Sequence, residues 1–176
     1  MPENRRFKLD KPQIYVKRFP QNPLLKPNTN INWMTKNIFN CGVVKDDGLY
    51  KMLFRASCTD DQSMSDIGFA VSSDGIDWSY LNKPVLKCSF NEHCAKGVED
   101  PRIIKWIDGY YYVFATAYSP DTIRVGIWKT KNFITYEWVC LPFDWEDKNS
   151  CLIPELINQK AFLLHRRSPD IWLSQT

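Results

Sequence analysis

The sequence has few of the features that mark metal-binding, membrane and secreted proteins. It contains only two histidines, and its six cysteines form no CxxC pair. Cys88, His93 and Cys94 lie close together but supply one ligand too few for a structural zinc site. No run approaches the ~20 apolar residues of a membrane-spanning helix, and the charged start "MPENRRFKLD" lacks an apolar signal-peptide core. We therefore expect no metal site and no membrane association.

A strong charge of one sign is also lacking. The chain has 23 basic and 20 acidic residues, a net charge of +3. This balance argues against a nucleic-acid partner but tolerates a small anionic substrate. No glycine-rich phosphate loop is present, and no Ser–His–Asp order stands out. Unpaired cysteines are typical of a reducing compartment, so we expect a cytoplasmic protein and leave a homo-oligomer open.

Aromatic side chains, in contrast, are abundant, with 7 Trp, 8 Tyr and 10 Phe. Aromatic and β-branched residues favour strands, and no stretch of 11 or more residues has convincing helical periodicity. Short apolar runs alternate with turn sequences such as "KDDG", "SSDG" and "IDG". We predict an all-β fold whose strands include residues 50–57, 67–73, 102–107, 110–118, 123–130 and 161–167.

These strands repeat as a set. "FNCGVVKDDGLYKMLFRA" is followed by "SDIGFAVSSDGIDW", and "EDPRIIKWIDGYYYVFATA" by "TIRVGIWKTKNFITYEW". Gly48 and Gly109 are 61 residues apart, and Trp78 and Trp138 are 60 apart. A third unit begins at "IPELINQKAFLLHRR". Three or four antiparallel strands repeated at such a period predict the blades of a β-propeller.

The length allows about two and a half to three blades. Propellers usually have four to eight, because the ring must close to cover its edges. We therefore expect the chain to be a fragment, with residues 1–30 as an extended lead-in and residues 31–176 as a partial β-propeller catalytic domain. "QIYVKRF" (residues 13–19) is a candidate short strand in the lead-in. The alternative is a small twisted sheet or sandwich.

Polar residues at the start of the innermost strands are the candidate site, because these strands line the central channel of a propeller. The three units place there Asn40, then Glu99, Asp100 and Arg102, then Glu155. The ends of the following strands add Arg55, Thr116, His165 and Arg166. Side chains of these types that converge on one axis would form a polar pocket of the size of a sugar.

Asp100 is the candidate general acid. Glycosyl transfer requires a proton for the leaving oxygen, and a positioned carboxyl group supplies it. The structural alternative is that Asp100 caps a turn before Pro101 or pairs with Arg102. The residues alone leave both interpretations open.

"GVEDPRI", together with "NPLL", "IFNCG", "YKMLFRAS", "SDIGFAVSSDGIDW", "PVL" and "KNSCLIPELINQKAFLLHRRSPDIWLS", resembles glycoside hydrolase family 130. This family of β-mannoside phosphorylases and some β-mannosidases has five-bladed propellers. The resemblance extends over nearly the whole chain and implies that the chain covers the N-terminal half of such a protein. The sequence departs from the family at Cys41, where a small residue or proline is usual, and at Asn149, where an aspartate commonly follows the lysine.

The resemblance implies an inverting reaction. Asp100 would donate the proton, by way of the mannose 3-hydroxyl, while inorganic phosphate attacks the opposite face and releases α-mannose 1-phosphate. An inverting hydrolase needs a second carboxylate to activate water, whereas phosphate is already anionic and needs only cationic positioning. The partners implied are a β-mannoside oligosaccharide and phosphate, with no cofactor besides phosphate as co-substrate.

The resemblance also implies binding roles. Sugar contacts are expected from Asn40 and Arg55, with Glu99 and Arg102 binding sugar or tuning the acid. Phosphate contacts are expected from Lys148, His165 and Arg166. Two alternatives stay open, an inverting β-mannosidase of the same fold and an inactive or carbohydrate-binding truncated propeller.

Overall fold

The computed structural model describes residues 17–60 and 64–175. These residues form eleven strands and one 3₁₀ helix, Glu92–Cys94. The first sheet contains β1 (Asn37–Asp46), β2 (Leu49–Ser57), β3 (Asp66–Ser72) and β4 (Ser79–Tyr80). The second contains β5 (Gly97–Lys105), β6 (Tyr111–Tyr118), β7 (Ile123–Thr130) and β8 (Glu137–Cys140). The third contains β9 (Lys148–Leu152), β10 (Phe162–Arg167) and β11 (Asp170–Gln175).

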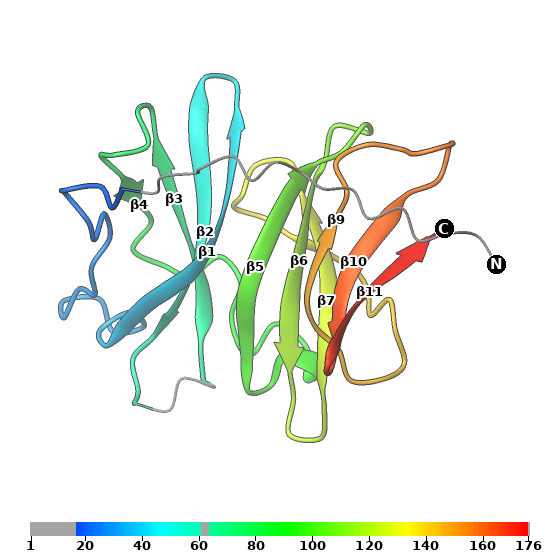
Figure 1. Cartoon of the computed structure of the whole chain (residues 1–176). Helices are drawn as coiled ribbons and strands as arrows, with labels where there is room; N and C mark the ends of the chain where they lie inside the picture. The colour runs from blue at the N-terminus through cyan, green and yellow to red at the C-terminus, as the bar shows by residue number, and fades with distance from the viewer. Residues whose placement is uncertain (1–16, 61–63, 176) are drawn as a thin grey trace.

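Each sheet is one antiparallel meander. The strand orders are β1-β2-β3-β4, β5-β6-β7-β8 and β9-β10-β11, and the three sheets lie side by side in chain order (Figure 1). This arrangement of successive blades confirms the prediction of a partial β-propeller and excludes a single twisted sheet. The predicted strands coincide with β2, β3, β6, β7 and β10 to within two residues, whereas β5 begins five residues before the predicted start at residue 102.

The first hairpin of each blade has backbone of left-handed conformation in its turn. Asp47 and Gly48, between β1 and β2, have φ of 51° and 74°, as a type I′ turn requires. Gly109 (φ 80°) lies in the corresponding turn of the second blade, and Asn158 and Gln159 (51° and 64°) in that of the third. Turn residues that tolerate positive φ therefore set the hairpin in all three blades.

Apolar packing joins the blades to one another. The largest cluster lies between the first two sheets and includes the fully buried Leu53, Ile67, Val98 and Trp128. A smaller one, built on Ile104, Phe114 and Val125 with Leu152 and Leu163, lies between the second and third sheets. An apolar cavity of about 420 Å³ remains beside it, lined by side chains of both sheets.

A charged cluster fastens the first two blades at the end of β1. The Asp46 carboxylate accepts hydrogen bonds from Lys105 (2.8 Å) and Lys51 (3.3 Å) and from the Tyr111 hydroxyl. The hydrogen bonds from Lys105 and Tyr111 hold the pKa of Asp46 far below its usual value. Asp46 and Lys51 come from the first blade, and Lys105 and Tyr111 come from the second.

The described segment before β1, which includes the end of the expected lead-in, packs against the first blade. Residues 17–36 form no strand, and their turns bring Leu25, Ile31, Trp33 and the fully buried Met34 onto the outer face of the first sheet. Residues 13–16 of the expected short strand lie outside the described part, and residues 17–19 are not in a strand. No helix among the described residues is long and apolar enough to cross a membrane.

Candidate active site

A β-bulge recurs in the first strand of every blade. Between Phe39 and Gly42 β1 has one residue more than its partner strand, and between Glu99 and Arg102 β5 does too. In the third blade the extra residue falls in β9, between Lys148 and Cys151. Each bulge begins with a residue of positive φ, a conformation that asparagine and aspartate adopt more readily than most others. These residues are Asn40 (47°), Asp100 (53°) and Asn149 (57°).

The bulges define equivalent positions in the three blades. The residue before each bulge pairs with the neighbouring strand, as Phe39 with Arg55, Glu99 with Thr116, and Lys148 with Arg166. The third position was therefore wrongly predicted as Glu155, which is exposed and lies outside the strands. The first two bulge residues are 60 positions apart, but the second and third are only 49 positions apart. A constant period of 60 residues therefore predicts the third site residue too far along the chain, beyond Asn149.

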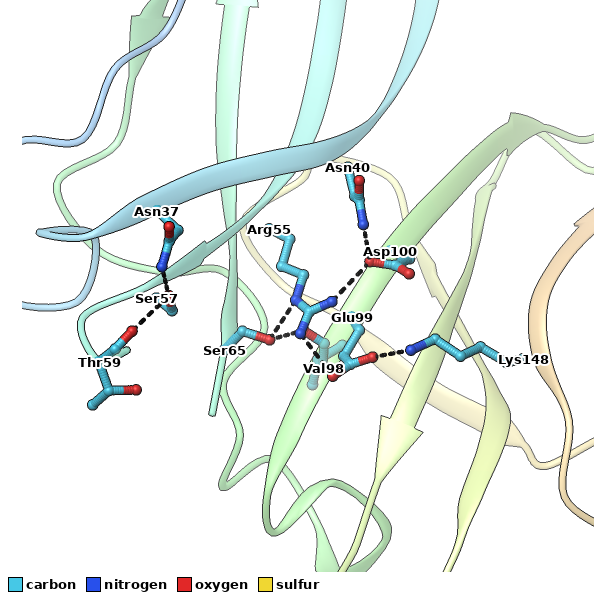
Figure 2. Close-up of polar contacts among 10 residues, drawn as sticks. All are labelled: Asn37, Asn40, Arg55, Ser57, Thr59, Ser65, Val98, Glu99, Asp100 and Lys148. Atoms are coloured by element: carbon cyan, nitrogen blue, oxygen red, sulfur yellow. Dashed lines mark hydrogen bonds and ion pairs between the residues drawn. The ribbon is translucent and has the colours of Figure 1, made fainter. Parts of the chain in front are cut away.

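Four charged side chains meet at the second bulge (Figure 2). The Arg55 guanidinium donates from Nη1 to Asp100 Oδ1 (3.1 Å) and from Nη2 to Glu99 Oε1 (2.8 Å). Lys148 Nζ donates to the other oxygen of Glu99, Oε2, at 2.5 Å. Asn40 Nδ2 donates to Asp100 Oδ1 at 2.8 Å. All three blades thus contribute to one network.

The network is buried and balanced in charge. Arg55, Glu99 and Asp100 have side chains no more than 9% exposed. Two cations face two carboxylates, as burial of charge requires. Arg55 is further held by Ser65 Oγ, which accepts from Nε at 2.9 Å, and by the Phe39 ring 4.6 Å below the guanidinium. These contacts fix the arginine, and through it the two carboxylates.

Asp100 is held by one oxygen only. Its Oδ1 accepts from both Asn40 and Arg55, whereas Oδ2 has no hydrogen-bond partner within the described residues. A carboxyl group fixed on one oxygen has the other available to carry a proton to a substrate. The interpretation that Asp100 pairs with Arg102 is excluded by these contacts, since Asp100 is bonded to Arg55 and Asn40.

Arg102 lies at the edge of the network. It is exposed, and Nη1 donates to the Cys41 carbonyl oxygen at 3.3 Å. The first strands of the first and second blades approach closely here. A Cβ atom added at Gly42 would lie only 2.4 Å from the Pro101 carbonyl oxygen. Glycine at position 42 therefore allows the two bulges to lie together.

Of the three candidate phosphate residues in the third blade, the neighbours His165 and Arg166 lie in different environments. Arg166 is exposed and borders a shallow pocket together with Lys148. His165 is buried, and both of its ring nitrogens have protein partners. Nδ1 lies 2.5 Å from Asp147 Oδ2, and Nε2 lies 2.9 Å from Ser174 Oγ.

Asp147 connects this histidine to the site, because its Oδ1 accepts from the Lys148 backbone amide at 2.7 Å. Ser174 lies within the regular strand β11, and we interpret the Asp147–His165–Ser174 chain as a structural support of β9. Among the described residues no group of three His, Cys, Asp or Glu side chains could hold a metal ion.

Three of these residues were not predicted from the sequence. They are Ser65, Asp147 and Asn149, of which only Asn149 had been noted, as a departure from a family pattern. The sequence does contain a pattern that identifies Asn149. Each bulge begins with Asn or Asp, which is followed by two residues of any type and then by two apolar residues. The three matches are "NCGVV", "DPRII" and "NSCLI".

Comparisons with known proteins agree with this arrangement. A family model described as beta-1,4-mannooligosaccharide phosphorylase matches residues 15–176. A 1,2-beta-oligomannan phosphorylase of Thermoanaerobacter sp. (strain X514) is 37% identical over 169 residues, which are 92% of this chain and 56% of the relative. A beta-1,2-mannobiose phosphorylase from the same organism is 32% identical and is also covered to 56%. The chain thus spans a little over half the length of these curated relatives.

Solved structures share the fold. The beta-1,2-mannobiose phosphorylase of Listeria innocua, in complex with beta-1,2-mannobiose, matches with a TM-score of 0.77 at 24% identity, over 90% of this chain and 62% of that chain. A structure from work on GH130 glycoside hydrolases that target beta-1,2 mannosidic linkages in Candida mannan matches with a TM-score of 0.79 at 21% identity, over 89% of this chain and 54% of that one.

Proposed function

Because this chain belongs to glycoside hydrolase family 130, a family of five-bladed β-propellers, we propose that it carries the acid side of a β-mannoside phosphorylase site. The whole protein would cleave β-mannosides with inorganic phosphate, with inversion, to α-mannose 1-phosphate. The observation that carries the proposal is the Asp100 carboxyl group, with Oδ1 fixed by Asn40 and Arg55 and Oδ2 unbonded. We propose a β-1,2 linkage because both curated Thermoanaerobacter relatives are named for it.

Asp100 is the proton donor in this proposal. The proton leaves Oδ2 for the mannose 3-hydroxyl, which passes its own proton to the bridging oxygen, so that the acceptor sugar leaves as an alcohol. A phosphate oxygen forms the new bond to C1 from the opposite face as the old C1–O bond breaks. Because phosphate brings its own negative charge, no second carboxylate is required.

Glu99 and the cations have positioning roles in this proposal. Glu99 bonds Arg55 with one oxygen and Lys148 with the other, so it sets the distance between the first and third blades. Lys148 and Arg166 supply positive charge on the phosphate side, and Arg102 lies at the rim beside the acid. His165 acts through Asp147 on Lys148, because both of its nitrogens are already bonded.

A β-mannosidase that uses water is the second candidate. It is favoured by the charge balance of the network, because Lys148 and Arg55 are both paired with carboxylates before any phosphate arrives. A related fold is also described for glycoside hydrolases that target beta-1,2 mannosidic linkages. The two candidates differ in whether cleavage depends on phosphate.

The test is incubation of the whole protein, of which this chain forms part, with β-1,2-mannobiose, with and without phosphate. Phosphate-dependent release of mannose 1-phosphate is expected, and release of free mannose alone in both conditions would favour the hydrolase. Asp100→Asn keeps an oxygen for Asn40 and Arg55 but cannot donate the acid proton, so turnover should fall by about 10²- to 10⁴-fold. Near-full turnover in Asp100→Asn would refute the assignment of the acid.

We further propose a cytoplasmic location and phosphate as co-substrate without any other cofactor. All six cysteines are free thiols in the structure, which fits a reducing compartment.

A further inference from the structure

A column of stacked side chains lies in the third blade and in the connection that leads into it. The His165 ring stacks on Phe143 with the ring centroids 4.2 Å apart, and Phe143 stacks on Trp145 at 5.1 Å. The Arg167 guanidinium lies 5.0 Å from the Trp145 ring and 5.3 Å from the Trp172 ring, both within the range of a cation–π contact. The column therefore extends from a buried histidine to an exposed tryptophan.

The charged member of this column joins three segments of the chain. Arg167 is the last residue of β10, Trp172 lies in β11, and Trp145 lies in the connection between β8 and β9. The planar guanidinium is suited to stacking on aromatic rings. Within residues 17–60 and 64–175 it has no hydrogen bond and no ion pair, so its polar interactions there are those with the two rings.

The connection between β8 and β9, residues 141–147, depends on such side-chain contacts. The pairing of β9 with β10 ends at Lys148 and Arg166, so the residues before Lys148 lie outside the ladder. Backbone support comes from the Asp147 amide, which donates to the Ile123 carbonyl oxygen at 3.1 Å. The two aromatic rings of the connection supply its stacking contacts with the end of β10.

The same two segments carry the cations of the phosphate side. Lys148 and Arg166 line the shallow pocket described above, whereas Trp145 and Arg167 do not. Arg167 directly follows Arg166, and adjacent residues of a strand point to opposite faces. The column thus lies behind the pocket, and the positions of both pocket cations depend on how firmly the two segments are stacked together.

We propose that Trp145 and Arg167 are positioning residues, which act through the stacked column to hold Lys148 and Arg166 in place for phosphate. This inference rests on the proposed function. Neither positioning residue touches the anion. Their contribution is to prevent displacement of the connection, because a misplacement of about 1 Å at a reacting centre can cost about 100-fold in rate.

The test varies phosphate at saturating β-1,2-mannobiose, with the whole protein of which this chain forms part. Trp145→Ala interrupts the column and keeps every charge. Its KM for phosphate should rise by about 10-fold, while kcat at saturating phosphate and the KM for mannobiose stay within about 2-fold. Trp145→Phe keeps a ring next to Arg167 and should restore the phosphate KM to within about 3-fold of wild type. An unchanged phosphate KM in Trp145→Ala overturns the proposal.

Arg167→Ala removes the cation of the column, and Lys131→Ala is its matched control. Lys131 is also an exposed cation over a ring, 4.4 Å from Tyr110 in the second blade, and it does not line the pocket. Arg167→Ala should raise the phosphate KM as Trp145→Ala does, and Lys131→Ala should leave it unchanged. If only Arg167→Ala raises it, the effect is that of a charge beside the anion, and the positioning role is refuted.

Hydrogen–deuterium exchange without substrate gives a readout that is independent of turnover. The amides of residues 142–148 should exchange at least about 5-fold faster in Arg167→Ala than in Lys131→Ala, because the column no longer holds this connection. Equal exchange in the two variants contradicts the proposal. If the wild type cleaves mannobiose without any need for phosphate, the phosphorylase proposal fails and the positioning role fails with it. If the wild type depends on phosphate but Trp145→Ala and Arg167→Ala match its phosphate KM, only the present inference fails.

Discussion

Arg55→Met should destabilise the protein strongly, because it removes the cation between two buried carboxylates. Glu99 and Asp100 have side chains 5% and 9% exposed, and Arg55 bonds them at 2.8 and 3.1 Å. Methionine retains much of the contact with the Phe39 ring but leaves these oxygens without their cation. Removing one partner of a buried ion pair lowers the free energy of unfolding by about 3–5 kcal/mol. For a domain of this size, about 2–4 °C of Tm corresponds to each kcal/mol, so we expect Tm to fall by about 6–20 °C.

The measurement is differential scanning calorimetry at pH 7, with Lys129→Met as the control. Lys129 pairs with Glu137 at 3.2 Å, but the Glu137 side chain is 62% exposed, and such surface pairs contribute about 0–1 kcal/mol. A double variant, Arg55→Met with Glu99→Gln, should recover part of the loss because it removes one of the two orphaned charges. The account of the network is refuted if Arg55→Met and Lys129→Met melt within about 3 °C of each other.

Three more predictions follow from packing and ionisation. Gly42→Ala places a methyl group against the Pro101 carbonyl oxygen, so its Tm should fall by several degrees as in other overpacked sites, while Gly48→Asn, in open space at positive φ, should change Tm little. The depressed pKa of Asp46 means that its ionised carboxylate stabilises the fold above pH ~4. This contribution to the free energy of unfolding is lost as the pH falls toward and through the pKa of Asp46 in the folded protein. The Tm difference between wild type and Asp46→Asn should therefore shrink on going from pH 7 to pH 2, and a constant difference would contradict the ion-pair account. Burial raises the pKa of Cys94 to about 12, so a native thiol titration with a disulfide reagent at pH 8 should leave Cys94 unmodified, and rapid labelling of Cys94 would disprove its burial. Fast labelling is expected at the exposed cysteines, Cys41, Cys58 and Cys151.

The strands and their grouping were predictable from the sequence, because period-two apolar runs and turn residues are local signals. "KDDG" and "IDG" specify hairpins through Gly48 and Gly109, whose positive φ the structure shows. The repeat then led to three blades and to Asp100 as the residue of most interest. These inferences needed no information about side-chain contacts.

The detail of the site was less predictable, because the bulge changes the alternation of side chains. In a regular strand Asp100 and Arg102 would share a face, which made their pairing plausible. The extra residue separates them, so Asp100 contacts Arg55 in another blade while Arg102 is exposed. A bulge of this kind depends on backbone conformation at one residue, for which the sequence offers only a weak preference of Asn and Asp.

Two of the three candidate phosphate residues of the third blade, both in β10, illustrate the opposite case. His165 and Arg166 are neighbours in β10, and adjacent residues of a strand point to opposite faces. His165 is accordingly buried against Asp147 while Arg166 is exposed. Here a local rule would have shown from the sequence that only one of them lines a given surface, although both were predicted to contact phosphate. That His165 supports Asp147 and thereby Lys148 depends on contacts between distant strands, which the sequence does not reveal.

The first two blades are connected at both ends of their inner strands, and this has a mechanical consequence. Arg55 and Asn40 hold Asp100 at one end, the Asp46 cluster joins β1 to β5 at the other, and the largest apolar cluster lies between them. The contact with the third blade has a smaller core and an adjoining cavity. From these contacts we expect the acid and its two donors to move together, and relative motion within this part of the protein to concentrate between β5 and β9. Such motion would change the distance from Asp100 to Lys148 and leave the hydrogen bonds on Oδ1 intact.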